Sequence, residues 1–258
     1  VAGTVADVGE AVEGFDVGDR VMGTGIGNAV HQGAYSEFAV IPTDRVVSVP
    51  TGVDLVAAGG AGVAAVTAWR ALVDHADLGP TEQCLIHGGS GGVGHAAVQL
   101  ANAMGARVLT TASPAYHDRV SDLGADVVVD YHREDLVEAV IEASDGGVDV
   151  ILDHRLDDYL QFDADVAATG CRVIGIGEND PEIGFTNDGV ARSKDVRFQF
   201  MSMFNMPDLR VGLRGVADLM ADGALDIVID RSYDLEAAGS AQRDVMAESF
   251  LGKLVIIP

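Results

Sequence analysis

The chain has 258 residues, of which 48% are hydrophobic, 5% are aromatic and 22% are charged. This composition is typical of a globular protein with one large or two modest domains, and it excludes a disordered chain. Its two cysteines, Cys84 and Cys171, are too few for a disulfide framework or a Cys-rich zinc lobe. Each lies in an apolar run, which predicts a buried free thiol.

The formal net charge is −24, from 40 acidic and 16 basic residues. Such a charge repels itself at ordinary ionic strength, whereas in roughly molar salt the Debye length falls to about 3 Å and screens it. We interpret the charge as a sign of a salt-rich cytoplasm, with a generically acidic protein of an ordinary cytoplasm as the alternative. Nucleic acid is not an expected partner, because its phosphates need a basic surface.

The sequence contains no uninterrupted apolar run of about eighteen residues, so we expect no membrane span and no membrane partner. It also lacks a basic segment followed by an apolar stretch at its start, so no secretory signal is expected. The first residue is Val1 rather than methionine, from which we expect that the chain begins inside a longer protein.

In chain order, residues 1–53 are rich in Gly and Val with frequent turn signals, and they predict short antiparallel strands. From Asp54 onward, short β-branched runs alternate with helical patterns. The predicted strands are 84–88, 106–113, 126–131, 148–154, 171–177 and 196–204, and the helices between them are 92–104, 114–123, 133–144 and 158–169. Strands that are apolar throughout and separated by helices predict an α/β fold with a doubly wound parallel sheet.

The end of the chain predicts two further helices and two further strands. They are helix 208–221, strand 226–233, helix 236–248 and strand 253–257. The final strand is expected to return to the N-terminal β unit.

Five glycines in seven positions lie between the first strand of the predicted sheet and the helix that follows it. Gly89, Gly91 and Gly94 have GxGxxG spacing, which in this context is typical of a dinucleotide-binding turn. The first glycine allows a tight turn, the second lets a diphosphate approach the backbone, and the third lets the helix approach the strand. Helix N–H groups then face the phosphates. The predicted contacts are Gly89, Ser90, Gly91, Gly92, Val93 and Gly94. The alternative is a glycine-rich turn without a ligand.

The end of the next strand favours one of the two nicotinamide dinucleotides. An acidic residue about 20 positions beyond the glycines is typical of NAD sites, where it binds the ribose 2′-hydroxyl. Ser113 stands there, 19 residues after Gly94, and Asp118 falls in the following helix. His117 and Arg119 carry positive charge nearby, so we predict NADP(H), with NAD(H) as the less favoured choice. The alternative for His117 and Arg119 is an exposed helix face.

Six segments in this order resemble the medium-chain dehydrogenase/reductase superfamily, in particular its zinc-independent quinone oxidoreductase branch, which includes zeta-crystallin. They are "VADVGEAVEGFDVGDRVMG", "GAYSEFAVIPTDRVVSVP", "VTAWRAL", "HGGSGGVGHAAVQLA", "GADVVVDYHRED" and "LGKLVII". The resemblance implies a Rossmann domain, at 63–205, inserted into a GroES-like β-barrel catalytic domain, at 1–62 and 206–258. It also implies that the N-terminal part of the barrel is missing from this chain.

The resemblance further implies a site between the two domains. Thr67, Phe204 and the backbone of Gly175, Ile176 and Gly177 would lie near the nicotinamide. Tyr131 would approach the adenosine ribose, and Lys253 would approach the cofactor from the barrel side. The alternatives are a helix-interior threonine, a core aromatic, a packed strand end and a solvated edge-strand lysine. No catalytic residue is assigned beyond the candidates Thr67 and Phe204.

Departures from the family pattern bear on the chemistry. The zinc-dependent relatives have a lobe of four cysteines and a catalytic cysteine where this chain has Val63, and His31 and His75 are isolated. A catalytic zinc needs three protein ligands, so no metal is expected. The segment "HRLDDYL" replaces a Gly-containing turn after the strand "VDVILD", which puts the local ribose contacts in doubt.

These observations predict an enzyme that transfers hydride from NADPH to a quinone or an α,β-unsaturated carbonyl. The choice between quinone, alkenal and enoyl thioester stays open. One alternative is a zinc-dependent alcohol or sugar dehydrogenase with its ligands in the missing segment, and another is a non-catalytic, crystallin-like NADPH-binding protein. The apolar strand 196–204 predicts a homodimer through edge pairing, with a strand capped by the barrel as the alternative.

Overall fold

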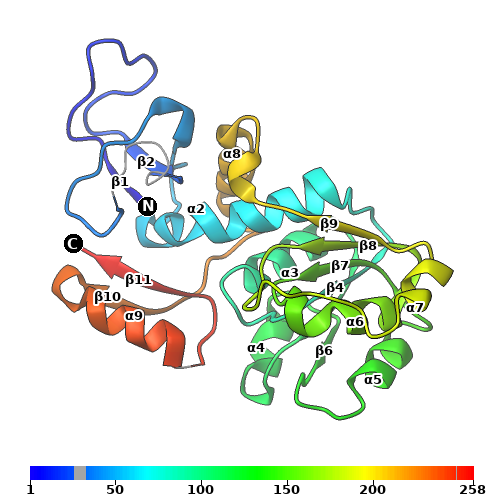
Figure 1. Ribbon diagram of the computed structural model, residues 1–258. Coiled ribbons are helices and arrows are strands. Elements are labelled where there is room, and N and C mark those ends of the chain that lie inside the picture. The colour runs from blue at the N-terminus through cyan, green and yellow to red at the C-terminus, as the bar shows by residue number, and fades with distance from the viewer. Residues whose placement is uncertain (26–32, 248) are drawn as a thin grey trace. The chain divides into compact units, whose positions relative to one another are not determined.

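The computed structural model describes residues 1–25, 33–247 and 249–258. The chain divides into two compact units (Figure 1). Unit 1 consists of Val1–Val66 and Met203–Pro258, and unit 2 consists of Thr67–Ser202. The second unit carries the predicted nucleotide turn.

Unit 2 contains a six-stranded sheet in which every neighbouring pair is parallel. Its strands lie in the order β6-β5-β4-β7-β8-β9. They are β4 (Gln83–Ile86), β5 (Arg107–Thr111), β6 (Val127–Val129), β7 (Val148–Asp153), β8 (Ala167–Gly175) and β9 (Arg197–Phe200). The predicted α/β fold with a doubly wound parallel sheet is confirmed.

Helices follow the strands and cover the sheet. They are α3 (Gly94–Ala103), α4 (His117–Asp122), α5 (Leu136–Ala143), α6 (Leu156–Val166) and α7 (Asp188–Ser193), with a short 3-10 turn η3 (Pro114–Tyr116) before α4. Leu85, Leu109 and Ile151 of the central strands pack in one buried cluster with Val140 of α5 and Val166 of α6. Because these strands lose water from both faces, their apolar runs are continuous rather than alternating.

The strand order reverses between β4 and β7. The chain runs outward from β4 to β5 and β6, then returns to the other side of β4 with β7, β8 and β9 (Figure 1). At such a reversal the connections leave in opposite directions and open a crevice beyond the carboxyl ends of the two central strands. That edge therefore positions the candidate site.

Unit 1 contains two small sheets. The strands β1 (Ala2–Thr4), β2 (Arg20–Gly23) and β3 (Val46–Ser48) are antiparallel, as predicted for residues 1–53. The strands β10 (Ile229–Asp234) and β11 (Lys253–Ile257) pair in parallel. The final strand thus lies in the same unit as β1–β3, as predicted, and within that unit it hydrogen bonds to β10.

The helices of unit 1 are α2 (Leu55–Trp69), α8 (Leu209–Ala221) and α9 (Ala238–Ala247). Single 3-10 turns precede β3, α8 and α9, at η1 (Thr43–Arg45), η4 (Met203–Asn205) and η5 (Leu235–Ala237). The last residues of α2 already belong to unit 2, and the helix continues there as a π-helical segment, η2 (Arg70–His75).

The continuous helix Leu55–His75 is the one helix among the described residues that is long and apolar enough to cross a membrane by length and composition. Glycines and a threonine interrupt its apolar side chains, so the sequence has no uninterrupted apolar run here. Of its most apolar window, 61% is buried inside the protein, as in the core helix of a globular domain.

Helix α6 ends earlier than predicted. Helical periodicity predicts a helix over 158–169, whereas α6 ends at Val166 and β8 begins at Ala167. The Lys194 ammonium donates hydrogen bonds to the carbonyls of Ala164 and Asp165, at 3.0 and 2.7 Å. A cation on the last carbonyls of a helix stabilises its end.

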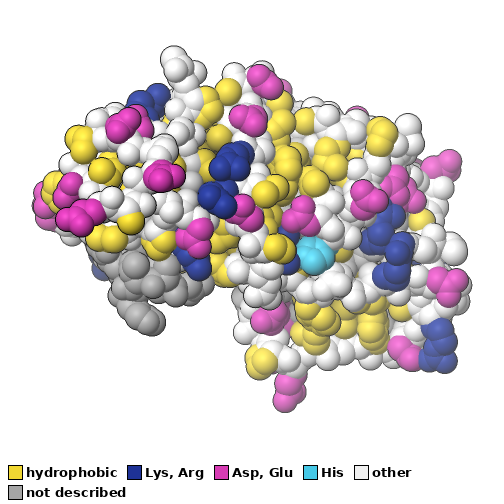
Figure 2. Space-filling model, turned by 90° about the horizontal axis from the view of Figure 1, so that it is seen from above, with side chains coloured by type: hydrophobic (Ala, Val, Ile, Leu, Met, Phe, Trp, Pro, Cys, Tyr) yellow, Lys and Arg dark blue, Asp and Glu magenta, His cyan; other side chains and the backbone are white. Residues whose placement is uncertain are grey.

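Acidic side chains are spread over the surface. Figure 2 shows Asp and Glu side chains scattered across one face, with Lys and Arg in small groups beside them. The excess of anions is therefore distributed rather than gathered in one patch on that face.

Candidate dinucleotide-binding site

The sequence-predicted residues of unit 2 come together at the carboxyl edge of the parallel sheet. The glycine turn Gly88–Gly94 follows β4, Ser113 follows β5, Tyr131 follows β6, and Gly175–Gly177 end and follow β8. In a parallel sheet all strands end at the same edge, so these residues share it although the sequence separates them widely.

Two glycines of the turn have no room for a side chain. A Cβ on Gly94 would lie 2.0 Å from the carbonyl oxygen of Gly88, and one on Gly89 would lie 2.3 Å from Thr110 Oγ1. Both distances are far inside van der Waals contact. The first and third glycines of the motif therefore fold the turn and bring α3 against β4.

The second glycine is different. A Cβ on Gly91 would meet only the Gly88 oxygen within 4 Å, at 3.2 Å. The turn itself therefore tolerates a side chain at Gly91 better than at Gly94. A glycine at Gly91 keeps the outer side of the backbone accessible to a ligand.

Hydrogen bonds from β5 fix the turn. Thr111 accepts from the Gly88 amide at its Oγ1 (3.0 Å) and from the Gly89 amide at its carbonyl (2.8 Å). Thr110 Oγ1 donates to the carbonyl of Ile86 at 2.6 Å. The first half of the turn is thus held in place.

The following helix presents its N-terminus at the same corner. Val93 is the N-cap of α3, which starts at Gly94, and its side chain makes no capping hydrogen bond. The first N–H groups of a helix lack partners within the helix and carry its positive dipole end. A glycine-rich turn that leads into a helix N-terminus fits a diphosphate. The Gly91 amide already donates to the Gly88 carbonyl at 2.8 Å, so the amides of Gly92 and Val93 are the groups that would hold one.

The predicted adenosine end lies at the ends of β5 and β6. Ser113 is half-buried, Arg119 is exposed on α4, and His117 Nε2 lies 3.1 Å from the carbonyl oxygen of Ala112. Tyr131 is 40% exposed, and its ring lies 4.1 Å from that of His132, centroid to centroid. Arg119 and Tyr131 are thus exposed at one end of the carboxyl edge. Ser113 and His117 are half-buried there.

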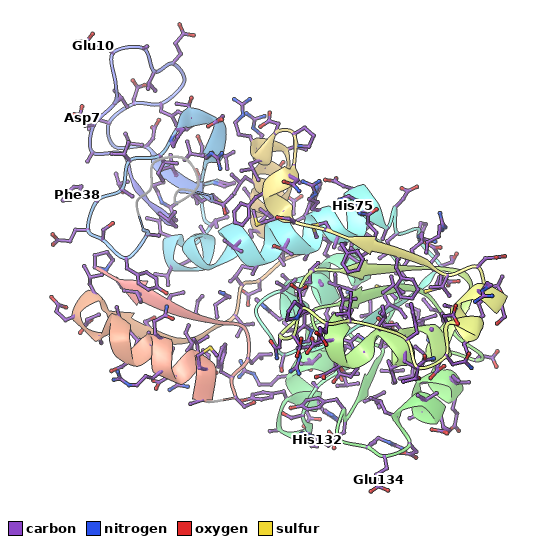
Figure 3. The ribbon with its side chains drawn as sticks, in the orientation of Figure 1. Asp7, Glu10, Phe38, His75, His132 and Glu134 are labelled. Atoms are coloured by element: carbon purple, nitrogen blue, oxygen red, sulfur yellow. The ribbon has the colours of Figure 1, made fainter. Side chains whose placement is uncertain are left out.

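One carboxylate also lies at this end. Asp130 accepts from the backbone and the ring of His132, at 3.0 and 2.8 Å, and Figure 3 shows His132 in the loop that follows β6. These two hydrogen bonds, with the nearby His117, lower the pKa of Asp130. The acid is therefore already engaged by imidazole groups.

At the other end, Gly175 and Gly177 make close backbone contacts. A Cβ on Gly175 would lie 2.3 Å from Leu156 Cδ1, and one on Gly177 would lie 3.1 Å from the carbonyl oxygen of His154. Between them, the Ile176 amide donates to the Asp153 carbonyl at 2.8 Å. Thr67 is 9% exposed on α2, at the first position of unit 2.

Phe204 and Lys253 belong to unit 1, so their approach to the nucleotide remains a prediction. Phe204 lies on η4 and is 45% exposed. Lys253 starts β11, and burial lowers the pKa of its ammonium.

Sequence reasoning missed a buried polar cluster behind the glycine turn. His87, the residue before the turn, has its Nε2 2.9 Å from Oδ1 of Asp163 on α6, and both side chains are fully buried. The His87 ring stacks on Tyr159 at 4.3 Å, and the carboxyl of Asp153 at the end of β7 lies close enough to Asp163 to raise its own pKa. A histidine after a strand is visible in the sequence, but its partner lies 76 residues away.

Burial shifts the pKa of each group in this cluster toward its uncharged form. Desolvation lowers the pKa of His87 to about 4, despite a nearby Asp153. It raises the pKa of Asp163 well above its usual value, and burial together with Asp163 raises the pKa of Asp153 to about 7. His87 and Asp163 therefore form a neutral hydrogen bond rather than an ion pair, which avoids the cost of burying two charges.

Within residues 1–25, 33–247 and 249–258, no group of three or more His, Cys, Asp or Glu side chains is arranged to hold a metal ion. His31 lies outside the described residues, and His75 accepts a hydrogen bond from Arg70 at 3.1 Å. Zinc independence remains a prediction.

Comparisons with known proteins match both parts of the chain. Residues 1–51 match the alcohol dehydrogenase GroES-like domain, and residues 123–256 match the zinc-binding dehydrogenase family. The quinone oxidoreductase of Lama guanicoe is 32% identical over 260 residues, which cover 100% of this chain and 78% of the relative.

The chain belongs to the medium-chain dehydrogenase/reductase superfamily.

Two further matches place it within the superfamily. The Escherichia coli quinone oxidoreductase, solved in complex with NADPH, superposes with a TM-score of 0.89 at 26% identity, covering 100% of this chain and 80% of that one. Polyketide synthase GfsB of Streptomyces halstedii is 35% identical over 260 residues, covering 99% of this chain but only 4% of the synthase. This superfamily member thus resembles both free-standing quinone oxidoreductases and a small part of a very large synthase.

We expect alanine substitutions at two glycines of the turn to differ in what they change. One should lower stability, and the other should weaken nucleotide binding. Gly94→Ala forces a Cβ against the Gly88 carbonyl, so we expect a loss of about 1–3 kcal/mol in the free energy of unfolding. Gly91→Ala brings its Cβ to 3.2 Å from the same oxygen, a tight contact that a small shift of the turn relieves. The melting temperature should therefore stay within a few degrees of wild type while nucleotide binding weakens. Differential scanning fluorimetry and NADPH titration measure the two effects.

Gly184→Ala is the matched control, because a Cβ there meets nothing within 4 Å. It should change neither quantity. Equal stability of Gly94→Ala and Gly91→Ala would contradict the packing role assigned to Gly94.

The buried cluster predicts a pH-dependent effect of Asp163→Asn. A carboxyl whose pKa is raised in the folded state binds more protons when folded, so its contribution to stability falls as pH rises from its unfolded pKa toward its folded pKa. Asparagine keeps a hydrogen-bonding group beside His87 without titrating. Relative to wild type, the variant should gain on the order of 1–2 kcal/mol between about pH 5 and about pH 8.

Urea denaturation at the two pH values gives the difference. Asp165→Asn is the matched control, because it makes the same change on the same helix at a half-buried carboxyl that is bonded to Gln161. A constant difference between wild type and Asp163→Asn across this pH range would show that Asp163 is not protonated in the folded protein.

Proposed function

We propose that the chain binds NADP(H) and transfers hydride to a quinone or another α,β-unsaturated carbonyl, without a metal ion. The observation that carries this proposal is the turn before α3, where Gly94 and Gly89 exclude side chains and the helix begins without a side-chain cap. The similarity to a quinone oxidoreductase solved with NADPH supports the same cofactor.

The choice of NADP(H) over NAD(H) rests on the ends of β5 and β6. Ser113 stands where NAD sites place an acid, and Arg119 and His117 lie on the next helix. Asp130, the acid at this end, is engaged by His132. A 2′-phosphate would therefore meet cationic and hydroxyl groups.

The nicotinamide supplies the hydride when the cofactor is bound; the protein positions the cofactor and the acceptor and excludes water. In this chain the turn would hold the diphosphate, and the backbone of Gly175–Gly177 would border the nicotinamide side. Reduction of a quinone or enone places negative charge on an oxygen, which hydrogen-bond donors stabilise without a strong Lewis acid. Thr67 is our candidate for the group that orients the nicotinamide amide, with Phe204 as an apolar wall.

The similarity to a polyketide synthase is a reason to test enoyl thioesters among the acceptors. An enoyl thioester is an α,β-unsaturated carbonyl, so it accepts hydride in the same way as an enone. We therefore include enoyl thioesters beside quinones and alkenals in the acceptor class. Because this chain covers only 4% of the synthase, we propose a class of acceptors and not a single acceptor.

Two other functions are the alternatives to this proposal. A zinc-dependent alcohol or sugar dehydrogenase would use ligands outside the described residues, and the zinc-binding dehydrogenase family match favours it. A non-catalytic NADPH-binding protein would share the turn but not the turnover.

We also propose a homodimer formed through β9. This strand lies at the edge of the six-stranded sheet, and its Phe200 is 57% exposed. An unpaired apolar edge favours pairing with a second copy. Light scattering of the full-length protein in molar KCl tests the dimer, and a monomer at all concentrations would contradict it.

The full-length protein should oxidise NADPH in molar KCl when it is given a quinone, an alkenal or an enoyl thioester. NADH should be a poorer donor with the same acceptors. Absorbance of the reduced nicotinamide follows the reaction, and metal analysis of the same preparation measures bound zinc.

Each alternative has its own outcome. Stoichiometric zinc together with alcohol oxidation would overturn the metal-free assignment. Tight NADPH binding without turnover on any acceptor of the panel would favour the non-catalytic protein.

The double substitution His117→Gln with Arg119→Gln should weaken NADPH binding by about 10-fold or more, because it removes cationic partners of a phosphate. NADH binding should change by less than about 2-fold, since NADH lacks the 2′-phosphate. Isothermal titration with both nucleotides measures the ratio.

The matched control is His75→Gln with Arg192→Gln, which removes the same side chains elsewhere on unit 2. It should leave both affinities unchanged. Equal losses for NADPH and NADH in the first variant would place His117 and Arg119 away from the 2′-phosphate.

A further inference from the structure

A histidine that the sequence analysis left without a role lies over the first residue of the glycine turn. His154 follows β7, the strand next to β4 at the reversal of strand order. Ile86 pairs with Leu152 across these strands, so the two positions beyond each, Gly88 and His154, come side by side at the carboxyl edge.

The imidazole occupies the space that a side chain on Gly88 would fill. A Cβ on Gly88 would lie 2.8 Å from His154 Cε1, with the two ring nitrogens at 3.4 and 3.5 Å. Gly88 has a φ of +68°, which also favours glycine at this position. The ring is therefore packed against the backbone that leads into the candidate diphosphate site.

The backbone of His154 is held on both sides. The Arg155 amide donates to Asp153 Oδ1 at 2.7 Å, and the Leu156 amide donates to the Gly177 carbonyl at 3.2 Å. The backbone of His87, the residue before the turn, also lies close to the ring. This segment replaces the glycine-containing turn of the family, and its contacts fix where the imidazole lies.

The residue is nevertheless exposed, which distinguishes it from His87. Desolvation of the ring lowers the pKa of His154 to about 4, and the nearby His87 and Arg155 lower it further, while Asp157 opposes them. Arg155 is itself paired with the carboxylates of Asp157 and Asp158. The exposed group that faces the turn from β7 is thus a neutral imidazole.

We propose that His154 is a dinucleotide-contacting residue that donates a hydrogen bond to a phosphate oxygen of the cofactor beside Gly88. The proposal rests on the proposed NADP(H) binding and adds a wall from β7 to a site otherwise formed by the turn and α3. Glycine motifs of this type bind through backbone amides; here a side chain joins them.

An anion at this position favours the protonated imidazole. Binding therefore raises the pKa of His154 from its low value in the free protein, and the complex takes up a proton below the raised pKa. Nucleotide affinity therefore increases as pH falls toward the pKa of His154 in the complex. The charged and titratable groups that face the ring in the free protein are His87, Arg155, Asp157 and Asp153.

The test is calorimetric titration of the full-length wild type and His154→Gln with NADH and NADPH, at about pH 6 and about pH 8. We expect the variant to bind both nucleotides about 10-fold more weakly at the lower pH, with a smaller loss at the higher pH. His75→Gln is the matched control, because η2 precedes β4 and lies toward the opposite edge of the sheet. It should behave as wild type.

A second readout needs no variant. NADH titrations of the wild type in two buffers of different ionisation enthalpy should show proton uptake at the lower pH. NADH is used because its diphosphate does not titrate in this range, unlike the 2′-phosphate of NADPH.

Unchanged affinity of His154→Gln together with no proton uptake would overturn the proposal. A loss confined to NADPH would overturn it too, since it would place the imidazole at the 2′-phosphate. Failure of the wild type to bind either nucleotide would instead overturn the proposed function, so the two failures are distinguishable.

Discussion

The contact between the Gly88 carbonyl and Gly94 determines how the carboxyl edge of the sheet is built. A Cβ on Gly94 would come within 2.0 Å of that oxygen, so α3 reaches this position only because the residue has no side chain. With the helix there, the start of α3 lies at the carboxyl end of β4, where the strand order reverses. In the function that we propose, phosphate binding would thus follow from backbone packing, and the polar side chains around the turn would adjust specificity.

Behind this turn, the molecule keeps polar groups in its core by keeping them neutral. His87 and Asp163 lie 2.9 Å apart without access to water, and burial shifts the pKa of each toward its uncharged form. Their hydrogen bond connects the residue before the glycine turn to α6. His154, on the other side of the same turn, has a similarly low pKa but is exposed to the crevice. One cluster therefore supports the turn from within, and one imidazole is available to a ligand.

Local patterns predicted the elements and the edge where the site lies, because apolar strands, helices and glycines each leave a signature within a few residues. The six strands of the sheet and the glycine turn follow from such signatures. Element boundaries that depend on distant groups could not be predicted from local patterns. Helix α6, for example, ends where the Lys194 ammonium donates to its last carbonyls. The pairing of β11 with β10 also depends on tertiary packing rather than on the strand's own sequence.

The same distinction applies to the site. Gly89, Gly91, Gly94 and Ser113 could be assigned from spacing alone, whereas the His87–Asp163 pair joins residues 76 positions apart. His154 was visible as a departure from the family pattern, but its position over Gly88 depends on the register of β4 and β7. Phe204 and Lys253 were assigned by resemblance, and their roles depend on contacts with the other unit.

A crystal structure of the full-length protein grown with NADPH tests the central claim most directly. The account predicts a diphosphate bound to the amides of Gly92 and Val93 at the start of α3, without displacement of Gly94 from the Gly88 carbonyl. A nucleotide bound elsewhere, or a turn that stays empty at saturating NADPH, would contradict it.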